Sequence, residues 1–409
     1  MGSIGRFVVQ YYQDAITHDL DTNRSLLGYA WSTSIMIGSL CAPFGGWLTD
    51  RWGYKITVLF GTILGIASTA VILLFPTPLG YVAGFGVLGG LAGVGASTSY
   101  VLVSQWFRYH RAKALMILSS AGSLGLAVLT PVFVMNDSWL TWKAAYRISI
   151  GIGLIFVLLI LFVVRERKNH DAEAPEAIEH DDLHEVEAED RNGQQAVVNQ
   201  PRIPALISNI KSHVGNPVLL VVILALFTCG FSMGTVEMHL MAIQQTMNVS
   251  HSMFIASLSI LGVLELVGGF VFAALLDRMP RALALGCLYF IRVIAFTLLL
   301  VHIHLSPVLF TLIFGATYLG AVPGGILIAN ESLKTGTVGL RTGMLLLFHQ
   351  LGGGVAAIAG GINYDLFHNY QAVIGINIGL SLCSTLGYFL VNKRIASKLS
   401  VQMVNAVSE

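Results

Sequence analysis

Several ionisable side chains, and one neighbouring glutamine, interrupt the apolar stretches of this sequence at places where they could do chemistry. They are Arg6, Glu237, His239, Glu265, Arg292, His349 and Gln350. A charged group inside an apolar segment is costly to bury, so such a residue is a functional candidate by default. A guanidinium group can bind a carboxylate through two hydrogen bonds. A buried carboxyl group can take up and release a proton as its surroundings change. These residue types suit the binding of a small anion together with a proton.

Helical geometry places three of the candidates at a similar depth in their segments. Glu265 precedes Asp277 by 12 residues, and Arg292 follows Pro280 by 12 residues. At the usual rise per residue, both lie about 18 Å from the same inner turn. Arg6 lies about 16 Å before the polar stretch that follows residue 16. We predict a shared depth near the middle of the segments. Arg292 is a candidate for substrate binding, a partner of Glu265, or a purely structural residue.

The same counting places the other candidates elsewhere. Glu237 and His239 come some 20 residues after Pro217, which puts them near the outer boundary. Glu237 is therefore a second candidate for proton coupling, or an interface residue with no part in it. His349 and the adjacent Gln350 lie on the inner half. Both histidines and Gln350 are candidates for substrate binding, with a hydrogen-bonded structural role as the alternative for each histidine.

The elements that must position these residues are long apolar runs. Of 409 residues, 55% are hydrophobic and 11% are charged, which is too apolar for a soluble protein of this size. Runs of about 20 apolar residues can cross a hydrocarbon core of about 30 Å as helices. The sequence predicts an all-α polytopic membrane protein. Its segments are 1–16, 26–48, 55–75, 80–104, 112–135, 144–164, 217–243, 252–276, 282–302, 306–329, 342–363 and 371–392.

The first of these segments is short. The stretch MGSIGRFVVQYYQDAI reaches the polar residues THDLDTNR after position 16. Either residues precede Met1 in the natural chain, or the first helix has half the usual length. A cleaved signal peptide is not expected, because a basic region followed by an unbroken apolar core is missing.

Lysine and arginine are distributed unequally between the two sets of loops. The loops after the second, fourth, sixth, eighth and tenth segments are basic, as is the C-terminal tail. The opposite loops carry only Arg24 and Lys143, with Arg147 at the start of the sixth segment. Basic loops face the cytoplasm, so we predict a multi-pass protein of the cell membrane whose central linker and C-terminus are cytoplasmic. The net charge of +1 gives no reason to invoke nucleic acid.

A long hydrophilic segment divides the chain. It runs from Glu166 to Asn216 and is acidic in its first part, which is typical of a solvated linker. Its histidines have no fixed spacing, so no metal site is predicted there. The predicted organisation is an N-terminal bundle (1–165), a cytoplasmic acidic linker (166–216), a C-terminal bundle (217–392) and a cytoplasmic tail (393–409).

Two inner loops carry related motifs. GGWLTDRWGYK joins the second and third segments, and AALLDRMPR joins the eighth and ninth. They look like the inner-loop gating signature of the major facilitator superfamily, on Gly46, Asp50, Arg51, Gly53, Lys55, Asp277 and Arg278. Within that superfamily the chain resembles the monocarboxylate porter and oxalate/formate exchanger branch, on QWFRYHRAKAL, SSAGSLG, CGFSMGTVEMHL and LFHQLGGG. The resemblance implies two six-helix bundles that rock about a midplane site.

The resemblance also implies roles for two of the candidates. Arg6, in RFVVQYYQD, occupies the position where those porters carry a first-helix lysine that binds the substrate carboxylate. The alternative is an arginine whose side chain snorkels to the membrane surface. Glu265 lies where they carry an eighth-helix aspartate used for proton coupling. The sequence departs from their pattern four residues later, where Gly269 replaces an arginine.

Other reactions lack the residues that they need. GFGVLG fits the literal pattern of a dinucleotide site, but it lies in an apolar run with no preceding strand, which favours helix packing. A Gly-Lys-Ser/Thr phosphate loop is missing, and the four cysteines lie singly in helices. Glycines such as Gly93, Gly95 and Gly352 predict closely packed helices. We predict no enzyme, no cofactor and no metal.

The function that these observations favour is secondary active transport of a small organic anion, coupled to protons, by a protein that is monomeric by default. One alternative is a proton-driven exporter of drugs or siderophore-like compounds, in which Glu265 would act but Arg6 would be dispensable. Another is a non-transporting sensor or a degenerate transporter, suggested by the short first segment.

Overall fold

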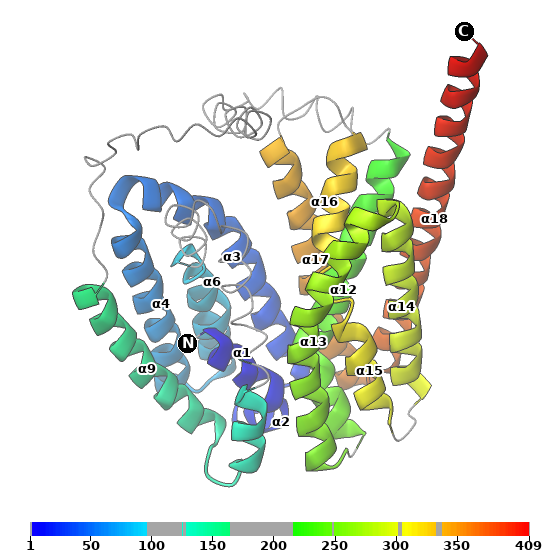
Figure 1. Ribbon diagram of the computed structural model, residues 1–409. Helices are drawn as coiled ribbons and strands as arrows, with labels where there is room; N and C mark the ends of the chain where they lie inside the picture. Colours follow the sequence, from blue (N-terminus) through cyan, green and yellow to red (C-terminus); the bar gives the residue numbers. More distant parts are fainter. Residues whose placement is uncertain are drawn as a thin grey trace.

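The computed structural model describes residues 2–95, 125, 128–163, 216–247, 249–301, 305–332 and 338–408. In these ranges every regular element is a helix, and the helices form two groups that lie side by side (Figure 1). The first group contains α1 (Gly2–Tyr11), α2 (Gln13–Asp19), α3 (Arg24–Trp52), α4 (Tyr54–Leu74), α5 (Pro78–Tyr81), η1 (Val82–Leu88), α6 (Gly89–Leu91) and α9 (Trp142–Val163). The second contains α12 (Pro217–Thr246), α13 (His251–Arg278), α14 (Arg281–Val301), α15 (Ser306–Gly315), α16 (Ala321–Ser332), α17 (Val338–Phe367) and α18 (Gln371–Ser408).

The all-α fold is confirmed, and seven of the described helices are long and apolar enough to cross a membrane. Two predicted segments are each divided into two helices, 1–16 at Tyr12 and 306–329 at residues 316–320. The last helix continues to Ser408 rather than ending near residue 392, since glycine and proline are missing from its final turns. The structure does not describe the linker before Asn216 or the QWFRYHRAKAL motif. The exposure of Gly46 and the side chain of Asp50 also lie outside the described part.

Local signals explain where some helices begin and end. The Asn216 side chain accepts a hydrogen bond from the backbone N–H of Val218 at 3.0 Å, and Pro217 occupies the first position of α12. Proline fits there because the missing N–H would have no helical partner. Gly53 joins α3 to α4 with a φ of 86°, which glycine adopts without the steric cost that other residues pay. The predicted inner-loop motif therefore needs glycine at this position.

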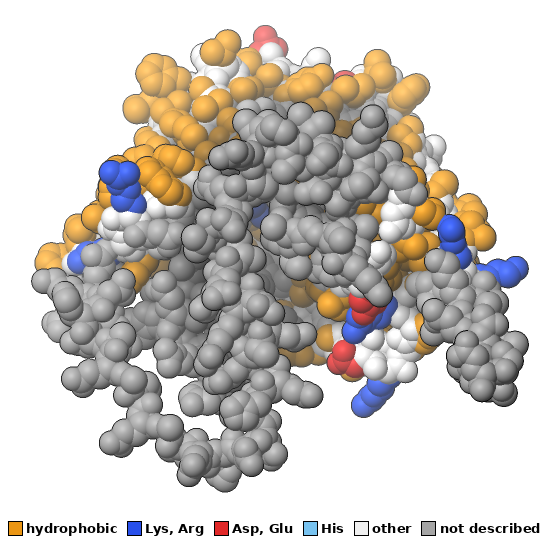
Figure 2. Space-filling view, turned by 90° about the horizontal axis from the view of Figure 1, so that it is seen from above, with side chains coloured by type: hydrophobic (Ala, Val, Ile, Leu, Met, Phe, Trp, Pro, Cys, Tyr) orange, Lys and Arg blue, Asp and Glu red, His pale blue; other side chains and the backbone are white. Residues whose placement is uncertain are grey.

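The perimeter of the molecule is apolar. Figure 2, which views the molecule from above Figure 1, shows hydrophobic side chains over much of its outline. Phe162, Phe270 and Leu390 are among the large side chains that the protein itself leaves exposed. An exposed apolar surface of this extent suits contact with lipid, as expected for a multi-pass membrane protein.

Helix α17 packs against α12 on one side and against α3 on the other, so it connects the two groups. A Cβ added at Gly352 would lie 2.1 Å from the carbonyl oxygen of Phe227 in α12. One added at Gly28 in α3 would lie 2.3 Å from the carbonyl oxygen of Ala357. The close packing predicted for the glycines of α17 is confirmed at Gly352, and glycine is required on both sides of this helix.

Replacing Gly230 by alanine is expected to destabilise the protein. Its Cβ would lie 1.7 Å from the carbonyl oxygen of His349, so α12 and α17 would have to separate. Overpacking of this kind costs about 1–3 kcal/mol. The measurement is thermal unfolding in detergent. The matched control is Gly375→Ala, where an added Cβ meets nothing within 4 Å. Equal melting temperatures for the two variants would contradict the packing.

Candidate functional site

Arg6 lies on the open side of α1. The side chains that follow it, Phe7, Val8 and Val9, are buried, and the Phe7 ring packs against Phe133 at 4.7 Å between centroids. The Arg6 side chain is exposed. The sequence of α1 thus divides into an apolar face that anchors the helix in the first group and a face that presents one cation.

Two hydrogen bonds join the N-terminal helices, α1 and α2, to α12. Gln13 donates from Nε2 to the carbonyl oxygen of Met238 at 2.5 Å, and Gln245 donates to the carbonyl oxygen of Tyr11 at 3.1 Å. Both bonds join the two groups of helices. Arg6 lies seven residues before Gln13, on the other side of the break at Tyr12. Its depth near the middle of the segments stays a prediction.

The middle of α12 presents one partly open edge. Between Thr228 and Gln244 every side chain is buried except those of Met233 and Glu237, which are half-buried. Because these two residues are four apart, they lie one above the other on the same face of the helix.

Glu237 and Glu265 both lie within electrostatic reach of Tyr318. The hydroxyl of Tyr318 donates to the Glu237 carboxylate at 2.7 Å. Glu265 is 6% exposed, on α13. Counting from Pro217 placed Glu237 near the outer boundary, apart from Glu265. Tyr318, in the break between α15 and α16, lies within electrostatic reach of both carboxylates.

Arg292 holds this break in place. Its side chain is fully buried and donates to the carbonyl oxygens of Thr317 and Tyr318 at 2.8 and 3.2 Å. The guanidinium carbon also lies 5.1 Å from the centre of the Phe314 ring. These contacts satisfy backbone carbonyls that the interrupted helix leaves free. Sequence reasoning named Arg292 as a substrate ligand or a structural residue, and its contacts are those of a structural residue.

Tyr318 is the residue that sequence reasoning missed. It lies in ATYLGAVPGG, where glycines and a proline interrupt an apolar segment. Interrupted segments of this kind often form binding sites in transporters. This signal could have identified Tyr318 from the sequence.

The two histidines have different surroundings. His239 is buried, its Nε2 lies 3.0 Å from the carbonyl oxygen of Ala357, and its ring lies 5.4 Å from that of Tyr370. It joins α12 to α17. His349 is half-buried, and its Nε2 lies 3.3 Å from the sulfur of Met233. Of the pair, only His349 lies beside the open edge of α12, next to the half-buried Gln350.

The inner-loop motif makes contacts at the other end of the first group. Lys55 donates to the carbonyl oxygen of Leu161 in α9 at 2.8 Å, and the Arg51 guanidinium lies 5.5 Å from the centre of the Trp47 ring. In the second group, Asp277 and Arg278 form the last turn of α13. They stay candidates for a gating role.

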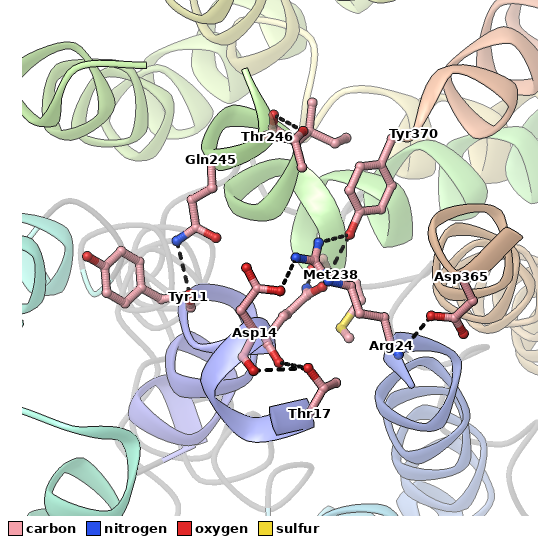
Figure 3. Close-up of polar contacts among 11 residues, drawn as sticks. Tyr11, Asp14, Thr17, Arg24, Met238, Gln245, Thr246, Asp365 and Tyr370 are labelled. Atoms are coloured by element: carbon pink, nitrogen blue, oxygen red, sulfur yellow. Dashed lines mark hydrogen bonds and ion pairs between the residues drawn. The ribbon is translucent and has the colours of Figure 1, made fainter. Parts of the chain in front are cut away.

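A polar cluster that the sequence did not predict joins the two groups at the α2–α3 turn (Figure 3). Arg24 is 3% exposed, pairs with Asp14, and donates to the Tyr370 hydroxyl at 2.7 Å. Its backbone N–H donates to Asp365 at 3.0 Å, and its guanidinium lies 3.5 Å from the centre of the Tyr364 ring. We call Asp14, Arg24, Tyr364, Asp365 and Tyr370 the Arg24 cluster. The sequence analysis had identified Arg24 only as one of two basic residues in the predicted outer loops.

Near this end, an ion pair lies entirely within the first group. Lys143 binds Asp19 at 2.8 Å, and the indole of Trp142 also donates to Asp19 at 3.0 Å. The bond with Lys143, and more weakly that with Trp142, lowers the pKa of Asp19. This pair connects α2 to α9 and does not involve the second group.

Two groups of membrane-crossing helices, with ionisable residues between their ends, define a polytopic transporter. The family model for the Major Facilitator Superfamily matches residues 1–333, and the chain belongs to that superfamily. It is therefore a secondary active transporter of small molecules.

Individual proteins show how far the likeness extends. The chain is 29% identical to an uncharacterized MFS-type transporter, YcxA of Bacillus subtilis, over 93% of this chain and 90% of that protein. It is 30% identical to a D-galactonate transporter of Escherichia coli over 35% of this chain and 34% of that one. It is 24% identical to monocarboxylate transporter 12 of Rattus norvegicus over 61% and 52%. The crystal structure of the nucleoside transporter NupG has the same fold, with a TM-score of 0.72 at 13% identity over 96% of this chain and 97% of that chain.

Proposed function

We propose that this transporter moves a small organic anion of the monocarboxylate type by alternating access, coupled to protons. The observation that carries the proposal is the exposed Arg6 on α1, a helix that a hydrogen bond from Gln245 joins to α12, which carries the half-buried Glu237. Two relatives are named as a D-galactonate transporter and a monocarboxylate transporter, and both of these substrates are carboxylate anions. The exposed guanidinium suits such a ligand, because it can donate two parallel hydrogen bonds to a carboxylate.

In the proposed cycle, residues 1–165 and 217–392 act as two bundles that rock about this site. The α2–α3 end faces outward, and the linker and C-terminus lie in the cytoplasm. Arg6 holds the anion while Glu265 takes up a proton, and Glu237 shares the proton site through Tyr318. Burial disfavours a charged carboxylate and a nearby cation favours it, so each change of conformation alters proton affinity.

Replacing Arg6 by alanine tests the proposal in proteoliposomes that contain the purified protein. We expect the wild type to take up labelled pyruvate, lactate or formate. In Arg6→Ala, the rate of this uptake should be lower by a factor of about ten or more. Charge-assisted hydrogen bonds contribute about 1.5–3 kcal/mol, and each 1.4 kcal/mol is tenfold in affinity. Arg6→Lys should keep part of the uptake, because it keeps the charge.

The matched control is Arg147→Ala, which removes an exposed arginine at the start of α9. It should transport like the wild type. Carboxylate uptake that survives Arg6→Ala unchanged would remove the anion role of Arg6. Proton-driven export of amphipathic compounds, with no carboxylate uptake by the wild type, would support the exporter alternative instead.

A further inference from the structure

Two sulfur atoms and an imidazole nitrogen meet where α12 crosses α17. Cys229 and Met233 are one turn apart on α12, with 3.8 Å between Sγ and Sδ. His349 of α17 brings its Nε2 to 3.3 Å from the Met233 sulfur, and its ring lies within electrostatic reach of the Cys229 thiol. We call these three residues the Cys–Met–His cluster. Gly230 makes the arrangement possible, because it lets the backbone of His349 contact α12.

These contacts are weak as hydrogen bonds. A thioether is a poor acceptor and a thiol is a poor donor, so an imidazole nitrogen facing Met233 gains little from it. The same three groups are good ligands for one class of partner, since thiolate, thioether and imidazole donors favour Cu(I). We propose that the Cys–Met–His cluster binds one soft monovalent metal ion, Cu(I), for which Ag(I) is the laboratory substitute.

The two donor separations at Met233, to Cys229 and to His349, are close to those of an ion held in a plane by three ligands. Metal–sulfur bonds of about 2.3 Å and metal–nitrogen bonds of about 2.0 Å require donors separated by about 3.7–4.0 Å. The two sulfur atoms already have this separation. The His349 nitrogen is a few tenths of an ångström too close to Met233, which a small rotation of either half-buried side chain would correct.

Charge favours a monovalent ion over a divalent one. Binding displaces the thiol proton: Cu(I) and the protonated Cys229 give a neutral copper thiolate and one free proton. A divalent ion would leave a net positive charge, with Arg292 beside Cys229. Among the residues that the structure describes, His, Cys, Asp and Glu side chains form no group of three that could hold a metal. The cluster becomes a site only when the methionine is counted as a ligand.

The position of the cluster determines its effect on transport. Met233 lies one turn from Glu237 on the open edge of α12, and both have half-buried side chains. A metal ion would connect α12 to α17 beside the proposed proton site. Binding should therefore inhibit transport, but binding itself does not depend on the proposed anion being the substrate.

The test measures Ag(I) and Cu(I) binding by the purified full-length chain in detergent. To remove other thiols, Cys41, Cys287 and Cys383 are replaced by serine, leaving Cys229 in place. We expect one ion per chain, release of about one proton, and competition with bicinchoninate for Cu(I). Zn(II) in excess should not displace Ag(I).

Met233→Leu is the decisive variant, because it keeps the side-chain volume and removes only the sulfur. We expect it to weaken Ag(I) binding at least about tenfold, and Cys229→Ser to abolish it. Met279→Leu, in the turn after α13, serves as the matched control. Each variant must elute from size exclusion like its parent. Unchanged binding by a well-folded Met233→Leu, displacement by Zn(II), or no binding by the parent would overturn the proposal.

Discussion

Glu265→Gln is expected to abolish accumulation driven by a pH gradient while leaving passive exchange of the substrate intact. The change keeps the size of the side chain and removes its ability to bind and release a proton. For transport of one proton with one monovalent anion, a gradient of one pH unit stores about 1.36 kcal/mol and supports an accumulation of about tenfold. In the variant this ratio should fall to one. The measurement is the internal concentration of labelled carboxylate in proteoliposomes with an imposed pH difference.

Two further variants sharpen this result. Glu331→Gln alters a carboxylate that is 58% exposed and paired with Arg281, and it should accumulate substrate like the wild type. Glu237→Gln should lower the rate without removing coupling, because the Tyr318 hydroxyl would then donate to a neutral amide oxygen, a weaker acceptor than the carboxylate. Tenfold accumulation by Glu265→Gln would contradict the proposed proton site. Loss of this accumulation in Glu237→Gln, but not in Glu265→Gln, would assign the coupled proton to Glu237.

The second large effect is expected at the other end of the site. Arg24→Ala should weaken the contact between the two groups of helices by about 2–4 kcal/mol, because it removes a charged hydrogen bond to Tyr370 and a cation–π contact with Tyr364. The pair with Asp14 contributes less, since that carboxylate is largely exposed. Such a loss changes the ratio of closed to open conformations by a factor of about 30–1,000.

Spin labels on either side of the contact would measure this change. The exposed residues His18 and His368 lie at this end in different groups and can be replaced by labelled cysteines. Arg24→Ala should add a population at longer distance. Lys143→Ala serves as the control, because its pair with Asp19 stays within the first group. An unchanged distance distribution in Arg24→Ala would show that other contacts hold this end closed.

The positions of most helices could be predicted because membrane insertion depends on local composition. An apolar run of sufficient length becomes a helix wherever it lies, so 217–243 and 282–302 correspond closely to α12 and α14. The break at residues 316–320 was not predicted. It exists because Arg292, from a different helix, satisfies the carbonyl groups of Thr317 and Tyr318, and no local pattern reveals such a partner.

The sequence by itself determined the class of protein and the set of ionisable residues within its apolar helices. These properties depend on chain length and hydrophobicity, which are local. Only the tertiary structure decided which of those residues meet. Tyr318 reaches Glu237, and Arg24 reaches Tyr370, across 81 and 346 positions in the chain. Such contacts depend on how closely glycine-lined helices approach one another, and that distance is a property of the packed molecule.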